Sequence, residues 1–148
     1  MNNSYWEWSA ANGETTVPTG LSEHQEQVMV VRWLDSWASK NWPHLATHKG
    51  KIPRAAIPNG ANRDAITGKN LKEEGVSAGF PDLFLPVPLG GFHGLFIEMK
   101  QVKKSAVSPT QDEWLNVLYR AKYKALVCRG HQAAILELCK YFDLGATK

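Results

Sequence analysis

Apolar residues recur at helical spacing in three segments of the chain, and shorter apolar runs lie between them. The first helical segment begins after Ser22, a good N-cap residue with Gln25 at the capping-box position, and ends near residue 41. The second begins at Ser108–Pro109, since a serine N-cap followed by proline is a typical helix start. The third covers residues 131–142. The pattern predicts three amphipathic helices.

Strand-like composition appears in the segments between these helices. Residues 78–101 contain two apolar runs joined by a glycine-rich connection that suits a hairpin. Residues 123–130 form a third run, which predicts a short buried strand. The two prolines within residues 44–60 predict a broken or edge strand pair. The order of helix, strands, helix, strand and helix predicts an α/β fold, with one central mixed sheet flanked by helices.

Two polar segments interrupt this pattern. Residues 1–20 are rich in Asn, Ser, Gly and Thr, which predicts a flexible N-terminal arm that docks by its aromatic residues. Residues 61–79 are polar and punctuated by glycine, which predicts a mobile loop with one helical turn. We therefore expect a single folded domain over residues 21–148.

Composition narrows the class of protein. A chain of 148 residues with 43% hydrophobic residues is long enough for one core, and its net charge of +3 permits a nucleic-acid partner without requiring one. The two cysteines lack CxxC spacing, which predicts reduced thiols. The five histidines form no pattern that is typical of a zinc site. No apolar run reaches membrane-spanning length and the polar N-terminus does not resemble a signal peptide, so we expect a cytoplasmic protein without membrane contact.

Three charged residues lie in the two hairpin runs, where a core strand should have none. Glu98 and Lys100 share one strand face because side chains alternate, and the hairpin can bring Asp82 toward Glu98. Two carboxylates this close repel each other unless a cation lies between them. Mg²⁺ suits such a pair, because it keeps several waters and takes phosphate oxygens as further ligands. With Lys100 to orient water or neutralise developing charge, the residues predict phosphodiester hydrolysis.

Simpler interpretations of these residues stay open at this point. Glu-x-Lys also occurs on solvated strand faces with a cross-strand ion pair, and Pro-Asp also forms turns. Other functional classes are a non-catalytic nucleic-acid binder, a small-molecule phosphatase and a structural protein. The phosphatase is disfavoured because the chain has neither a glycine-rich phosphate cradle nor a histidine cluster.

The motifs as a set resemble a known family. Pro81–Asp82 followed by Glu98-Met99-Lys100 is similar to the PD-(D/E)XK nuclease superfamily. The blocks EHQEQ, IPNG, LKEEGVSAGFPDLFLP, GLFIEMK, SPTQDEW and VCRGHQAAI, in this order, resemble the VRR-NUC domain, above all its stand-alone bacteriophage versions. The likeness covers about residues 21–142. It implies a restriction-endonuclease-like core and, if the protein is phage-encoded, the cytoplasm of a bacterial host.

The resemblance also implies roles for the motif residues. Asp82 and Glu98 would hold Mg²⁺ or Mn²⁺, the carbonyl of Met99 would add a ligand, and Lys100 would be the catalytic lysine. The activity implied is a divalent-metal-dependent DNA endonuclease, structure-selective for branched or Holliday-junction DNA. The alternative is a non-catalytic nucleic-acid-binding module on the same fold.

Two further site residues follow from the resemblance. An acid on the first helix completes the site of the family, and the chain offers Glu23 and Glu26. Glu23 is preferred because it lies four residues before Gln27, although either acid could simply interact with the helix dipole. Gln111 resembles a glutamine near the family's site, and its alternative is a solvent-facing helix residue.

The expected partners are DNA and a second copy of the chain. Relatives of this size often act as homodimers, and the aromatic residues Trp6, Trp8 and Trp42 exceed what one small core needs, which favours an interface. Basic residues around the predicted cleft are candidate phosphate contacts, although each could be a solvated surface charge. They are Arg63, Lys69, Lys72, Lys103 and Lys104.

Overall fold

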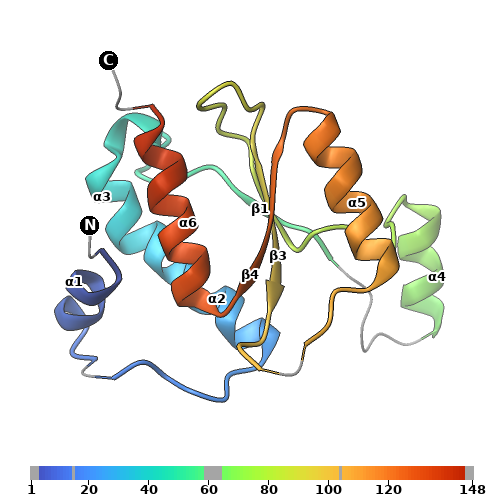
Figure 1. Cartoon of the computed structure of the whole chain (residues 1–148), viewed down its shortest axis with the longest axis horizontal. Coiled ribbons are helices and arrows are strands. Elements are labelled where there is room, and N and C mark those ends of the chain that lie inside the picture. The colour runs from blue at the N-terminus through green and yellow to red at the C-terminus, as the bar shows by residue number, and fades with distance from the viewer. Residues whose placement is uncertain (1–3, 15, 59–64, 104, 146–148) are drawn as a thin grey trace.

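The computed structural model describes residues 4–14, 16–58, 65–103 and 105–145. A mixed four-stranded sheet lies between two layers of helices (Figure 1). Its strands are adjacent in sequence order, from one edge of the sheet to the other. They are β1 (Ala55–Ala56), β2 (Leu83–Leu85), β3 (Leu95–Lys100) and β4 (Lys124–Arg129). The predicted α/β class with a central mixed sheet is confirmed.

The central strand β3 pairs differently on its two sides. It pairs with β2 antiparallel, Leu83 opposite Ile97, as the predicted hairpin requires. It pairs with β4 in parallel, which needs a crossover, and α5 (Pro109–Arg120) supplies it. β4 is an edge strand whose Val127 is 36% exposed, so the expectation of a buried strand was wrong. Residues 44–58 provide only the short β1 instead of a strand pair.

One helical layer packs on the sheet through the main core. It contains α2 (Glu23–Trp33), a π-helical turn η1 (Leu34–Ala38), α3 (Ser39–Asn41) and α6 (His131–Asp143), and a short 3₁₀ turn η2 (Pro43–Leu45) follows α3. The predicted capping box is present: Ser22 Oγ accepts from Gln25 N–H and Gln25 Oε1 accepts from Ser22 N–H. Ile97 and Met99 of β3 are fully buried against this layer.

The N-terminal arm is helical where it was expected to be loosely structured. Helix α1 (Ser4–Ala11) packs on α6 (Figure 1), and Tyr5 and Trp8 are buried in the main core. Trp8 Nε1 donates to Ser36 Oγ at 2.7 Å. Aromatic docking was therefore predicted for the right segment. The helix was missed because its own sequence has no apolar stripe, and the contacts that order it are tertiary.

Two other expectations also need correction. Residues 65–73 form a helix, α4 (Ala65–Glu73), where the sequence favoured a loop with one turn. Trp8 and Trp42 are 2% and 5% exposed and belong to the core, so neither is available for a dimer interface. Trp6 remains 45% exposed.

The opposite face of the sheet carries a smaller aromatic cluster under α5. Phe96 contacts Phe80, Phe84 and Tyr123, and Phe80 also contacts Trp114 of α5. Helix α4 lies outside α5, far from α2 and α6 (Figure 1). In the described part of the chain, no helix is long and apolar enough to cross a bilayer.

Candidate active site

Glu98 and Lys100 lie on the same side of β3, as strand alternation predicts, near the end of the strand where α2 begins (Figure 1). Both are buried, at 2% and 6% exposed. Lys100 Nζ is 3.3 Å from Glu98 Oε1, so the two charges form a buried ion pair. This contact rules out the solvated strand face that Glu-x-Lys could otherwise represent.

Asp82 comes directly before β2 and lies across from the end of β3. Its Oδ2 accepts a hydrogen bond from the backbone N–H of Met99 at 2.8 Å. Burial, and after it the negative charge of Asp82, raise the pKa of Glu98 to about 7 against the opposing effect of Lys100. The two carboxylates are thus close enough to interact, which is the convergence that the hairpin predicted.

The backbone of Met99 faces Asp82. The carbonyl oxygen of Gly94 accepts from Lys124 N–H, and that of Lys100 accepts from Gly130 N–H. Even-numbered residues along this strand therefore direct their backbone N–H and C=O groups toward β4. In a strand the next residue turns its groups the other way. The carbonyl oxygen of Met99 therefore lies on the same side of β3 as Asp82.

Gln111 connects the start of α5 to Glu98. Its Oε1 accepts from Ser108 N–H at 2.9 Å in a second capping box, while Ser108 Oγ accepts from Gln111 N–H. Because Oε1 is engaged there, the amide nitrogen is turned away, and Nε2 donates to Glu98 Oε1. Gln111 is thus not a plain solvent-facing residue, since it orients the buried carboxylate.

The structure separates the two acids of α2. Glu23 Oε1 is 3.7 Å from Lys100 Nζ and accepts from Ser105 Oγ at 2.5 Å. Glu26 points elsewhere and binds His131 through both the backbone N–H and the ring Nδ1. Glu23 is therefore the acid at the cluster. Ser105 was not anticipated from the sequence, because it lies 82 positions from Glu23 and only the fold brings them together.

The cluster has the features of a site for a hard divalent cation. Glu98 Oε2 is buried and receives no hydrogen bond from any described residue, which is costly for a carboxylate oxygen without a bound cation. Asp82 and the Met99 carbonyl lie on the adjoining strands. No group of three or more His, Cys, Asp or Glu side chains in the described ranges is suited to a metal. Two carboxylates plus a carbonyl fit Mg²⁺, which retains several waters, better than zinc.

The predicted basic residues lie at varying distances from this cluster. Lys69 and Lys72 are exposed on α4, outside α5, and Lys69 Nζ is 3.8 Å from Glu73. Lys103 is exposed just after β3 and lines a pocket next to the cluster. Arg63 and Lys104 lie outside the described residues.

Comparisons with known proteins agree with this geometry. The VRR-NUC domain family model matches residues 21–132. A solved structure described as a VRR_NUC domain protein aligns with a TM-score of 0.68 and 28% sequence identity, covering 86% of this chain and 93% of that chain. A search of curated proteins found no match. The family match spans most of the sequence, so the chain belongs to the VRR-NUC domain family, whose members are generally nucleases.

Proposed function

We propose that the protein is a divalent-metal-dependent DNA endonuclease of the PD-(D/E)XK type that hydrolyses phosphodiester bonds. One observation carries the proposal: Asp82, Glu98 and Lys100 meet at one end of β3, and a buried carboxylate oxygen there has no described donor. The family match supports a nuclease-type activity, and the site supports the metal-dependent mechanism.

Asp82, Glu98 and the carbonyl of Met99 would hold Mg²⁺ or Mn²⁺. The cation would stabilise negative charge on a phosphoryl oxygen and acidify an attacking water. Glu98 must be ionised for this role, although its pKa is raised to about 7. Gln111 favours the required orientation, because its Nε2 holds Glu98 Oε1 and leaves Oε2 as the available ligand atom.

Lys100 supplies the positive charge that the hydrolysis needs at the phosphate. Its ammonium is held between Glu98 and Glu23, at 3.3 and 3.7 Å, so its position is fixed before substrate binds. A pre-organised cation stabilises the charge that develops in the transition state and can orient the attacking water. Glu23, anchored by Ser105, acts by positioning Lys100.

DNA recognition is proposed to rely on the phosphate backbone and on the shape of branched or junction DNA. Lys103 is exposed three residues after Lys100, and Lys69 and Lys72 on α4 would contact a longer substrate across α5. Such contacts position DNA without specifying bases. A homodimer would suit a four-way junction, and Trp6 is the one of the three predicted interface tryptophans that is exposed.

A cleavage panel tests the proposed function. Labelled linear duplex, single strand, flap and four-way junction are incubated with wild-type protein in Mg²⁺, Mn²⁺ or EDTA. Lys100→Ala is the catalytic blank, and Lys40→Ala, an exposed lysine on α3, is the matched control. We expect cleavage only with metal, retained in the control and lost in the blank.

Two outcomes of this panel would contradict the proposal. Cleavage that persists in EDTA would exclude the metal-dependent mechanism. DNA binding by wild-type protein without cleavage of any substrate would instead favour the non-catalytic binding module, for which a buried carboxylate with a raised pKa has no use.

A further inference from the structure

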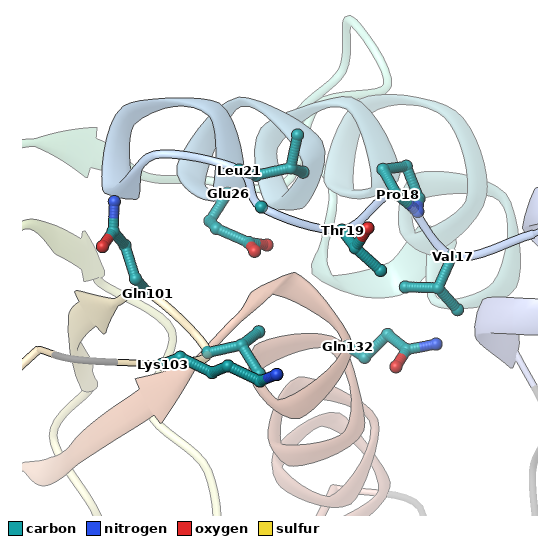
Figure 2. A pocket seen from close by; sticks show the side chains of 10 residues that line it. Val17, Pro18, Thr19, Leu21, Glu26, Gln101, Lys103 and Gln132 are labelled. Carbon is teal, nitrogen blue, oxygen red and sulfur yellow. The ribbon is translucent and has the colours of Figure 1, made fainter.

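A pocket of about 610 Å³ adjoins the candidate active site. It lies between the segment that precedes α2, the first turns of α2, the segment that follows β3 and the start of α6 (Figure 2). Its volume falls within the roughly 300–1,000 Å³ that is usual for small-molecule sites. Lys100 and the residues proposed to bind metal do not line this pocket.

The pocket adjoins the cluster through the chain segments that the two have in common, although no residue of the cluster itself lines it. Gln101 lines the pocket and directly follows Lys100 in the chain. Glu26 also lines it, one helical turn after Glu23, which contacts Lys100. Gln101 lies at the end nearest the beginning of α2, whereas Gln132 lies toward the opposite end (Figure 2). The segment after β3 and the first turn of α2 thus border both the cluster and the pocket.

Glu26 gives the pocket a buried hydrogen-bond acceptor. Its side chain is 2% exposed and extends into the space between α2 and α6 (Figure 2). Oε2 accepts from His131 N–H at 2.7 Å and contacts the His131 ring. No described residue donates to Oε1. Gly130 borders this part of the pocket, and a Cβ there would collide with Val102 Cγ2 at 2.7 Å while making ordinary contact with both Glu26 oxygens at 3.7 Å.

The remaining walls combine apolar surfaces with amide groups. Val17, Pro18, Leu21 and Val102 provide the apolar surface, and Gln101 and Gln132 add amide groups at the two ends. A purely apolar ligand would remove water from Glu26 Oε1 without offering it a donor, which is unfavourable. A small cation would have one carboxylate and too few other ligands. A flat heterocycle with an N–H edge can pack its faces on the apolar walls and donate a hydrogen bond to Glu26.

We propose that this pocket binds one unstacked nucleobase of the DNA, next to the phosphate held at the cluster. The proposal rests on the proposed nuclease function and adds to it a reason for structure selectivity. A base leaves the stack at low cost only where DNA is branched, mismatched or single-stranded. Its N–H edge donates to Glu26 Oε1, and its faces contact the apolar walls. Exposed Lys103 at the lining is placed to contact an adjoining phosphate.

The test combines a change in the protein with a change in the DNA. Flap and junction oligonucleotides carry a tetrahydrofuran abasic residue at each position around the cleavage site in turn. Binding is measured by fluorescence anisotropy in EDTA, so the readout does not depend on catalysis. Gln132→Trp fills the pocket, Glu26→Gln removes the acceptor charge, and Leu136→Trp, exposed on the next turn of α6, is the control. Circular dichroism checks that each variant is folded. If Glu26→Gln does not fold, the test relies on Gln132→Trp.

We expect one position at which the abasic residue weakens wild-type binding by about tenfold, the size of a hydrogen bond to a charged group. Gln132→Trp should weaken binding of intact DNA by a similar factor and abolish the difference between intact and abasic DNA. Leu136→Trp should behave as wild type. The base pocket is refuted if no abasic position weakens binding. It is also refuted if the loss from the abasic residue is the same in Gln132→Trp as in wild type. In both cases the nuclease proposal stands. If the cleavage panel is also negative, the proposed function fails first.

Discussion

Replacing Glu98 by glutamine should stabilise the metal-free protein at high pH while it removes activity. Glu98 is 2% exposed, and burial together with the charge of Asp82 raises its pKa from 4.5 to about 7. Glutamine has almost the same shape and its Oε1 can still accept from Gln111 Nε2. The substitution therefore removes the ionisation of the side chain with little change in packing.

The size of the effect follows from linkage between protonation and folding. Below pH 4.5 Glu98 is protonated in both the folded and the unfolded state, so its titration contributes nothing. Between pH 4.5 and 7 the unfolded state ionises first, and wild-type stability falls relative to the variant as the pH rises. Above pH 7 both states are ionised and the full difference is reached. A pKa change of this size corresponds to about 3 kcal/mol.

Urea denaturation in EDTA at about pH 5 and pH 9 measures this difference. The free energy of unfolding of Glu98→Gln, relative to wild type, should rise by about 2.5 kcal/mol between the two conditions, because the smaller part of the full difference is already present at pH 5. Glu113→Gln, an exposed acid on α5, is the control and should show little change. A difference that stays constant with pH, or moves in the opposite direction, would refute the claim that Glu98 is held at an energetic cost.

Three further predictions concern Lys100, the docking of α1 and the phosphate contacts. Lys100→Ala should lower the cleavage rate about 100-fold or more in a gel assay, with anisotropy showing DNA binding retained. Trp8→Ala should lower the free energy of unfolding in urea by about 3 kcal/mol, because Trp8 is 2% exposed, whereas Trp6→Ala at 45% exposed should change it little. The logarithm of DNA affinity should fall linearly with the logarithm of salt concentration, because phosphate contacts release counterions.

Each of these has a result that would count against it. Cleavage by Lys100→Ala at the wild-type rate would remove the lysine from the mechanism. Equal stability of the two tryptophan variants would mean that α1 does not dock on α6. An affinity that is independent of salt would argue against recognition of the DNA backbone.

The sequence was sufficient where local patterns determine structure. The Ser22 and Ser108 caps and the hairpin each follow from signals within a few residues. Strand alternation alone placed Glu98 and Lys100 on one side. Helix α1 was missed because its order comes from Tyr5 and Trp8 packing on α6, a contact between distant segments.

The site itself was predictable only in part, for the same reason. The spacing to Gln27 favoured Glu23, but both acids lie in the first turn of α2, and their partners separate them: Lys100 for Glu23 and His131 for Glu26. Gln111 was expected near the site from the resemblance alone. Its second role in the capping box, which fixes the orientation of its amide, appears only when α5 is placed beside β3.

Calorimetric titration of Mn²⁺ into DNA-free protein tests the central claim most directly, because it asks whether Asp82 and Glu98 share a cation. We predict one saturable binding event in wild-type protein at pH 8, lost in Asp82→Ala and in Glu98→Gln and retained in Glu113→Gln. Wild-type protein that gives no saturable heat, or the same heat as Asp82→Ala, would contradict the metal-dependent site.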